Sequence, residues 1–399
     1  MNENYRLFSS ESVTEGHPDK VCDLVADSIL DAALAGDPKS RVAVEVCAST
    51  DYMMIFGEMT TDADIDAEAV ARAAIRSVGY DSAEKGMDAD NCRIDVRIKK
   101  QSPDISQGVT GSLEKRAGAT DPDDALGAGD QGMMFGYACM ETPSMMPMPI
   151  ALSHTLSRRL AEVRRSGVLP YLRPDGKVQV TVAYGKDGVP HHVDTVVVSA
   201  QHDEGVPLAQ LQDDIKREVI LSSIGSELIT PDTRFIINPS GRFVLGGPAG
   251  DSGLTGRKII VDTYGGSVPH GGGAFSGKDP TKVDRSASYY ARYVCKNLVA
   301  AGAADKMELQ VAYAIGSAHP VSLCVNTHGT GHIKDKYILD IIRGFFDFRP
   351  GAIIRTLGLE APIYAATTNY GHFGKRDLPW EQTDKASDIM AYIRTLPTA

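Results

Sequence analysis

The chain has 399 residues, 42% of them hydrophobic, and a formal net charge of −11 at pH 7. This length and apolar content suffice for two or three domains, each with its own core. An acidic chain repels nucleic acid, and the sequence has neither a run of about 18 apolar residues nor an apolar signal region near its N-terminus. We therefore expect a cytoplasmic protein that neither spans a membrane nor binds nucleic acid.

The first hundred residues show both helical and strand periodicity. Residues 18–35 predict a helix, because Pro18 suits the first turn, apolar residues recur at helical spacing and Gly36 ends the run. Alternating residues predict strands, and a second helical run precedes the last of them. In chain order these elements are a strand around 42–46, a strand at 52–59, a helix at 66–78 and a strand at 94–98.

Residues 101–129 show no periodicity and are rich in Gly, Ser, Asp and Pro. Loops of this length are usually lids, binding loops or disordered segments, and we predict a flexible lid loop over 104–126. The next block predicts a helix, two strands and a helix at 149–166, 177–184, 191–199 and 207–223. The last block predicts strands near 234–245 and 258–263, a Gly-rich loop at 265–277, a helix at 280–301, strands at 307–315 and 321–327, and a helix at 335–347.

These blocks predict an N-terminal domain at 1–103, a central domain at 127–244 and a C-terminal domain at 245–399. Each block mixes paired strands with helices and lacks strict βαβαβ alternation, which favours an α+β fold over a doubly wound sheet. The similar content of the blocks suggests a repeated architecture, although no repeat is visible in the sequence itself.

The strongest local motif runs from Gly265 to Lys282, GGSVPHGGGAFSGKDPTK. Consecutive glycines let backbone amides approach a phosphate, and Lys278 adds a positive charge. The stretch from Gly272 to Lys278 fits GxxxxGK, but Asp279 follows where a P-loop has Ser or Thr, and no βαβ unit surrounds it. A flexible Gly-rich surface loop is the better general interpretation, although the density of charged residues after the glycines argues against it.

A second motif, His17-Pro18-Asp19-Lys20, opens the first predicted helix. A helix N-terminus attracts anions, His17 can donate a hydrogen bond to a phosphate or ether oxygen, and Asp19 can bind Mg²⁺. A first-turn acid that interacts with the helix dipole explains Asp19 equally well. Two other Gly-rich stretches, 127–132 and 246–258, surround charged side chains, but a solvated turn accounts for them too.

In combination these segments resemble the S-adenosylmethionine synthetase family over roughly residues 5–385. The motifs that carry the resemblance are ESVTEGHPDK at 11–20, KQSPDISQG at 100–108, GAGDQGMMFG at 127–136, LRPDGK at 172–177, NPSGRFVLGGPAGD at 238–251 and LTGRKIIVDTYGGSVPHGGGAFSGKDPTKVD at 254–284. The resemblance implies three similar α+β domains around a pseudo-threefold axis. It also implies a homodimer or homotetramer with active sites at the subunit interface.

The resemblance implies an enzyme that transfers the adenosyl group of ATP to the sulfur of L-methionine and then hydrolyses triphosphate to phosphate and pyrophosphate. It implies Mg²⁺, two ions per site, held by Asp19 and Asp284. It further implies K⁺ at Glu45, although a glutamate on a strand is more often solvent-facing. The competing hypotheses are another ATP-using enzyme, such as a P-loop ATPase or a kinase, and a non-catalytic subunit that binds adenosine nucleotides.

The resemblance also assigns substrate contacts. ATP contacts fall on His17, Asp175, Lys177, Arg242, Phe243, Asp251, Arg257, Lys258, Ala274 and Lys278. Methionine contacts fall on Glu58, Gln101, Asp130, Asp251 and Lys282. Catalytic roles fall on His17, Lys177, Arg257, Lys258 and Lys278. The stretch 109–126 departs from the family pattern, because it is longer than the usual loop.

Overall fold

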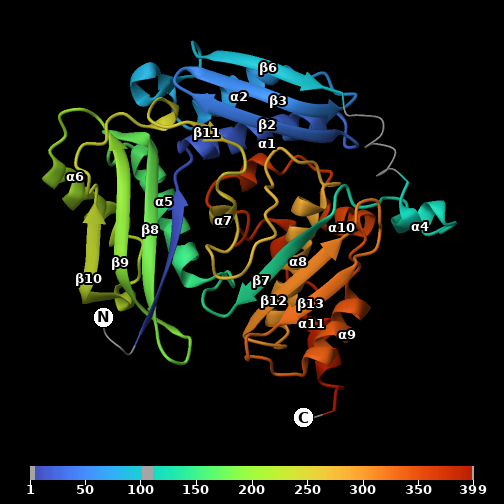
Figure 1. Cartoon of the computed structure of the whole chain (residues 1–399). Helices are drawn as coiled ribbons and strands as arrows, with labels where there is room; N and C mark the ends of the chain where they lie inside the picture. The colour runs from blue at the N-terminus through green and yellow to red at the C-terminus, as the bar shows by residue number, and fades with distance from the viewer. Residues whose placement is uncertain (1–4, 101–110, 398–399) are drawn as a thin grey trace.

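Three main β-sheets and the helices packed on them form an α+β architecture (Figure 1). The structure is a computed structural model that describes residues 5–100 and 111–397. In Figure 1 the first sheet lies at the top, the middle sheet at the left and the third sheet at the lower right. A small two-stranded sheet, β4 (Asp81–Ser82) with β5 (Met87–Asp88), lies between the elements of the first sheet in the chain.

The first sheet follows the predicted elements closely. In sheet order its strands are β11 (Gly253–Leu254), β2 (Arg41–Ser49), β3 (Tyr52–Thr60) and β6 (Arg93–Lys99). The valines at 42, 44 and 46 of β2 are buried, because alternate residues of a strand point to the same face. That face packs against α1 (Pro18–Gly36), while α2 (Ala67–Ser77) connects β3 to the parallel strand β6.

The middle sheet carries two of the longest strands in the described chain. In sheet order its strands are β1 (Arg6–Val13), β8 (Leu172–Tyr184), β9 (Pro190–His202) and β10 (Ile229–Ile237). Helix α5 (Met148–Arg165) packs on β1 and β8. The predicted helix at 207–223 is α6 (Leu208–Ile215), which continues as a π-helical turn over Lys216–Ile220.

The third sheet surrounds the most deeply buried helix. Its strands, in sheet order, are β13 (Ser322–Asn326), β12 (Lys306–Tyr313) and β7 (Gly132–Cys139). Helix α8 (Val283–Ala300) packs on β7 and β12 and has almost no exposed residue. The remaining helices of this region are α9 (Asp335–Phe345), α10 (Pro350–Leu357) and α11 (Ala386–Ile393).

The three sheets repeat one order of elements. A long helix precedes each β-hairpin: α1 before β2 and β3, α5 before β8 and β9, and α8 before β12 and β13. In the first two sheets a further helix leads to a strand that runs parallel to the second hairpin strand. In the third, α9 follows the hairpin, and no fourth strand joins this sheet within the described ranges.

Each block also lends its first strand to another sheet. Strand β1 precedes α1 but pairs with β8, β7 precedes α5 but pairs with β12, and β11 precedes α8 but pairs with β2. All three pairings are antiparallel, and the colours in Figure 1 show each lent strand beside a distant part of the chain. The exchange closes a ring among the three blocks.

The buried side chains form two separate cores. One core joins the first and third sheets through α1 and α8, and the other fills the space between the middle sheet and α5. Burial of this apolar surface is the main driving force for folding.

Two predicted segments adopt another structure, and the predicted strand near 234–245 ends early, since β10 stops at Ile237. The predicted strand at 258–263 is a short helix, α7 (Ile259–Asp262), because the Asp262 carboxylate turns inward to pair with Lys20 instead of alternating outward. The stretch 101–129 was expected to lack regular structure, but its described part contains the helical turn α4 (Leu113–Arg116) and a 3₁₀ turn over Pro122–Asp124. Tertiary contacts override local preference in both segments.

Candidate active site

The candidate site begins at the N-terminus of α1. His17 is the N-cap residue, and its Nδ1 accepts a hydrogen bond of 3.2 Å from the backbone N–H of Asp19. Burial, reinforced by the neighbouring Lys258 ammonium, lowers the pKa of His17 to about 3. The ring is therefore neutral at pH 7, and because Nδ1 acts as an acceptor, Nε2 carries the proton. A neutral hydrogen-bond donor thus stands at a positively polarised helix end.

Asp19 lies in the first turn of the same helix and is almost completely buried. Its carboxylate is 2.6 Å from the Lys258 Nζ, 3.9 Å from the Arg257 guanidinium and accepts the Leu254 backbone N–H at 3.0 Å. Burial alone would raise the pKa of Asp19, but Lys258 and the Leu254 N–H outweigh it, so the pKa is lowered. An ionised carboxylate and two cations are therefore held together by residues 235 or more positions apart.

A buried ion cluster behind the site holds these segments together. The Lys20 Nζ lies 2.8 Å from Asp23 and 2.7 Å from Asp262, and all three side chains are at most 4% exposed. The cluster links α1 to α7, whose N-cap is Lys258. The sequence shows Lys20 only as part of HPDK and offers no signal for its partner Asp262, because that contact spans 242 residues.

A pocket of about 350 Å³ opens beside His17. It brings together the predicted ATP contacts His17, Asp175, Lys177, Phe243 and Asp251, and its wall includes Ser199, Ser240 and Leu245. Lys177 on β8 pairs in register with Ser199 on β9, which explains why a serine that the sequence did not indicate lines the pocket. Ser240 lies within the NPSGRF stretch, which would have been its only signal.

Asp175 has the most perturbed carboxylate in this pocket. Burial raises its pKa to about 6, against the opposing effects of the Gly247 N–H at 2.9 Å and of Lys177. The predicted partner of Phe243, Arg242, instead points to solvent and pairs with Glu204 at 2.7 Å. The pocket therefore offers one aromatic ring, two carboxylates and a lysine.

A second group of predicted residues lies on the loop before α8, in the first turn of α8 and just before β7. The Lys278 Nζ contacts the Asp284 carboxylate at 2.7 Å, and Lys282 pairs with the buried Asp279. Asp130 is exposed. Within the described part of the chain, no hydrogen bond or ion pair joins this second group to the pocket beside His17.

The Gly-rich loop at 265–277 is packed against strands. A Cβ at Gly271 would lie 1.6 Å from the Met133 carbonyl oxygen, and a Cβ at Gly277 would lie 1.9 Å from the Val44 carbonyl oxygen. These glycines are needed for close approach to β7 and β2, so the loop is neither a free surface loop nor the phosphate cradle of a P-loop. Ala274 sits on this loop against Gly256.

The two predicted strand glutamates differ in their surroundings. The Glu45 carboxylate accepts a hydrogen bond from the Thr255 hydroxyl, and burial raises its pKa. Glu58 is 3.4 Å from the Lys99 Nζ in a partly exposed pair. Gln101, the remaining predicted methionine contact, lies outside the described residues.

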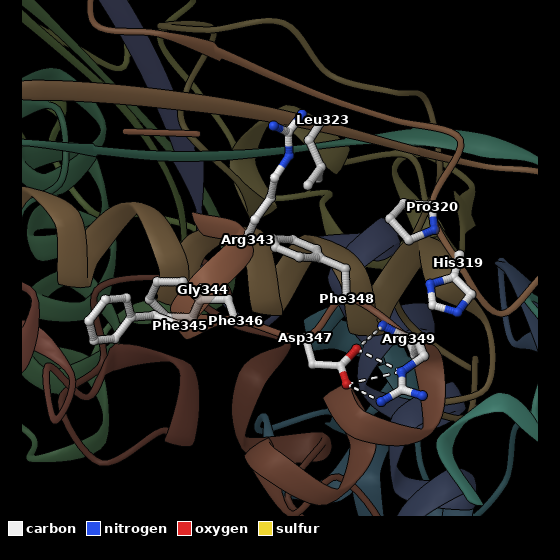
Figure 2. Close-up of a pocket in the computed structure, with 10 residues that line it drawn as sticks. All are labelled: His319, Pro320, Leu323, Arg343, Gly344, Phe345, Phe346, Asp347, Phe348 and Arg349. Carbon is white, nitrogen blue, oxygen red and sulfur yellow. Dashed lines mark hydrogen bonds and ion pairs between the residues drawn. The ribbon is translucent and has the colours of Figure 1, made fainter. Parts of the chain in front are cut away.

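Two larger cavities lie elsewhere in the described chain, one of about 590 Å³ beside Lys39 and Thr281 and one of about 580 Å³ near the end of α9. Figure 2 shows the residues that line the second of these, where the dashed lines join Asp347 to Arg349. Its ten lining residues run from His319 to Arg349 and include none of the predicted site residues. The smaller pocket beside His17 is the candidate site, because it combines convergent polar groups with perturbed pKa values.

Comparison with known proteins settles the family. Three family models match: the S-adenosylmethionine synthetase N-terminal domain at residues 5–103, the central domain at 125–243 and the C-terminal domain at 245–382. The chain belongs to the S-adenosylmethionine synthetase family. A protein of Clostridium botulinum (strain Alaska E43 / Type E3) named S-adenosylmethionine synthase is 56% identical over 390 residues, which cover 97% of this chain and 100% of that protein.

The family assignment confirms the predicted resemblance and the α+β fold. It does not test the individual site residues, which stay predictions supported by the geometry above. Among the helices of residues 5–100 and 111–397, none is both long and apolar enough to cross a membrane.

The described part of the predicted lid, residues 111–126, contacts the loop between β12 and β13 and the start of α10. The Glu114 carboxylate accepts the Ala318 N–H and the Ser317 hydroxyl, both at 2.9 Å. Burial opposes ionisation of Glu114, but the hydrogen bonds from Ala318, Ser317 and their neighbours hold its pKa at about 2. Arg349 contacts Asp121 at 2.8 Å and Asp124 at 3.0 Å. A lid role for 104–126 therefore stays a prediction, and any movement has to break these contacts.

Proposed function

We propose that this member of the S-adenosylmethionine synthetase family forms S-adenosylmethionine in the pocket at the N-terminus of α1, with ATP bound there. The observation that carries the proposal is the convergence of neutral His17, ionised Asp19 and the Lys258 ammonium next to a pocket with an aromatic wall. Phe243 provides a face on which adenine can stack, and Asp175 and Lys177 lie at the same wall.

The reaction is an attack by the methionine sulfur on the 5′ carbon of ATP, which expels triphosphate. A thioether carries no proton to remove, so no general base is required. The chain has two tasks instead. One is to align sulfur, carbon and oxygen, which is worth up to ~7–11 kcal/mol in favourable cases. The other is to stabilise the charge that develops on the leaving oxygen.

His17, Lys258 and Arg257 suit the second task. The protonated Nε2 of His17 donates a hydrogen bond to the leaving oxygen, and the two cations balance the charge of the triphosphate. Because the Lys20 cluster links α1 to α7, which Lys258 caps, His17 and Lys258 need little reorganisation during the reaction. Asp251 at the pocket rim favours the cationic sulfonium product.

Asp19 and Asp284 are the groups that would hold Mg²⁺. Within the described residues, no three His, Cys, Asp or Glu side chains converge on a metal position. Single carboxylates still fit this ion, because Mg²⁺ commonly binds one or two carboxylates and completes its shell with phosphate oxygens and water. When bound, Mg²⁺ would supply further positive charge for the leaving triphosphate.

Glu45 is the group that would hold K⁺. The oxygens of Glu45, the Thr255 hydroxyl and the Val46 carbonyl lie together on β2 and at the end of β11. A set of oxygen donors of this kind suits a hard monovalent cation. We also propose that the protein acts in the cytoplasm.

The separation of the two residue groups supports an active site shared by two copies of the chain. His17, Asp19 and Lys258 stand on one side, and a second group is formed by Lys278 on the loop before α8, Asp284 in the first turn of α8 and the exposed Asp130 just before β7. We propose that the second group of one protomer faces the pocket of its partner in a twofold dimer. A twofold operator would then create two equivalent complete sites.

The test is product analysis after incubation of the purified protein with ATP, methionine, Mg²⁺ and K⁺. We expect S-adenosylmethionine, phosphate and pyrophosphate in equal amounts by mass spectrometry and phosphate assay. ADP as the nucleotide product, with or without methionine, would indicate a kinase or a P-loop ATPase instead. Tight nucleotide binding with no turnover would indicate the non-catalytic subunit.

A further inference from the structure

Asp279 is a carboxylate near the second group, and both of its oxygens accept hydrogen bonds. The side chain is fully buried and receives four hydrogen bonds. Its Oδ2 accepts the Val42 N–H of β2 at 2.8 Å and also contacts the Lys282 ammonium. Its Oδ1 accepts the Thr281 N–H at 3.0 Å and the Thr281 hydroxyl at 2.6 Å.

The backbone around Asp279 joins the same strand. The Asp279 N–H donates to the Val42 carbonyl at 3.1 Å, and the Val44 N–H donates to the Gly277 carbonyl at 3.0 Å. Asp279 therefore stands where the loop before α8 meets β2. Shortly after it in the chain come Lys282, the predicted methionine contact, and Asp284, the carboxylate paired with Lys278.

We propose that Asp279 is a positioning residue that directs the Lys282 ammonium and anchors the Lys278–Asp284 segment to β2. The sequence offered Asp279 only as the residue that breaks the P-loop pattern. The geometry gives it a different purpose: its charge faces a lysine that would otherwise be free to rotate about four side-chain bonds.

An asparagine at this position cannot reproduce the arrangement. All four contacts are made by donors, and only a carboxylate has two oxygens to accept them. The amide has one acceptor oxygen, and its NH₂ group would face two of the four donors. Lys282 is the partner that can leave, because its side chain is 19% exposed, while the Val42 and Thr281 N–H groups belong to the backbone and the Thr281 hydroxyl is buried.

The experiment compares Asp279→Asn, Lys282→Gln and the double variant with Asp31→Asn as the matched control. Asp31 also accepts two backbone N–H groups, those of Tyr364 and Ala365, but has no lysine partner among the described residues. The first readout is the rate at which an amine reagent labels Lys282 in the full-length protein at one pH, measured by peptide mass spectrometry.

We expect labelling of Lys282 to rise about tenfold or more in Asp279→Asn, as for the loss of one hydrogen bond to a charged group. It should not change in Asp31→Asn, and labelling of the buried Lys20 should stay constant in both variants. Unchanged labelling of Lys282 in a folded Asp279→Asn protein would overturn the proposal.

The second readout is kinetic and rests on the proposed role of Lys282 in binding methionine. Asp279→Asn and Lys282→Gln should raise the KM for methionine by similar factors and affect the KM for ATP much less. If Asp279 acts through Lys282, the double variant should resemble Lys282→Gln alone. Multiplication of the two factors would mean that Asp279 acts independently, which contradicts the proposal.

The two readouts separate the positioning role from the methionine site. In one outcome Lys282 is labelled faster in Asp279→Asn, while neither Asp279→Asn nor Lys282→Gln changes the KM for methionine. That result would exclude Lys282 from the methionine site and leave the positioning role of Asp279 intact. If Asp279→Asn does not fold, the pairing predicts that adding Lys282→Met restores folding, because no ammonium is then left without a partner. Failure of that double variant to fold would make Asp279 a purely structural anchor and overturn the proposal.

Discussion

Replacing Asp19 by asparagine removes one negative charge from α1 and keeps the side chain's shape. The amide oxygen can still accept the Leu254 N–H, but the Lys258 ammonium loses its counter-charge. Breaking a fully buried ion pair costs ~3–5 kcal/mol. Because the Lys258 side chain is 14% exposed, we expect the free energy of unfolding to fall by less, ~2–3 kcal/mol. The variant should therefore remain folded at 25 °C.

The effect of Asp19→Asn on catalysis should be larger than its effect on stability. Asp19 orients the Lys258 ammonium and is a proposed Mg²⁺ ligand, so its loss should lower kcat by ~10²–10³-fold, as the loss of one preorganised electrostatic group does. Asp284→Asn should cause a similar loss from the second residue group. Asp66→Asn is the control, since Asp66 caps the start of α2 but lies outside both groups.

Mixing the two inactive variants tests the shared active site. If each site combines Asp19 of one protomer with Asp284 of its partner, a mixed dimer contains one site with both substitutions and one intact site. Random exchange makes half of the dimers mixed, so about a quarter of the wild-type activity should return. The assay is S-adenosylmethionine formation after co-refolding or co-expression, with subunit composition checked by native mass spectrometry.

Three results would refute parts of this reasoning. Near-normal turnover of either variant at limiting Mg²⁺ would remove that carboxylate from the metal site. Mixed dimers that form but recover no activity would mean that both carboxylates serve the same chain's site. Loss of folding in Asp19→Asn, seen as a lost thermal transition, would assign the residue to the start of α1 alone.

Four other outcomes are expected. Burial lowers the pKa of His154 to about 3, whereas a histidine in the unfolded chain binds a proton below about pH 6.5. The free energy of unfolding should therefore decrease as the pH falls from about 6.5 to about 3. His154→Gln should lower the slope of unfolding free energy against pH by about 1.4 kcal/mol per pH unit in this range. The profile of kcat against pH should have no inflection near pH 6.5 that belongs to His17, because burial holds the pKa of His17 at about 3. Replacing His17 by asparagine should therefore remove no inflection from this range. Glu45→Gln should abolish activation by K⁺ while leaving most of the basal rate; an unchanged K⁺ titration would exclude the site. Cleavage after Lys115 or Arg116 should slow adenosyl transfer more than hydrolysis of added triphosphate, and equal slowing of both would contradict a lid.

Local sequence patterns were sufficient for most regular elements. The helix at 18–35 and the strands around 42–46 and 52–59 are α1, β2 and β3, because each periodicity reflects one buried face. The predicted strand at 258–263 was wrong because that rule does not hold there. Its β-branched residues look like a strand, but the buried pair of Asp262 with Lys20 decides the local conformation.

The family motifs located the site residues but could not show how they are grouped. His17, Asp175 and Phe243 meet in one pocket, while Lys278 and Asp284 pair at the N-terminal end of α8. A motif reports which residue types are present at which spacing. It carries no information about which side of a fold each side chain faces.

By itself, the sequence determined the elements, the α+β class, the family and the residue types that the chemistry needs. Tertiary structure alone decided the ring in which β1, β7 and β11 join sheets built from other blocks, since a strand's periodicity is the same whichever neighbour it pairs with. It also decided that Asp279 faces Lys282 and Val42, the latter a contact across 237 residues. Such contacts leave no local pattern, because they depend on where distant segments lie in space.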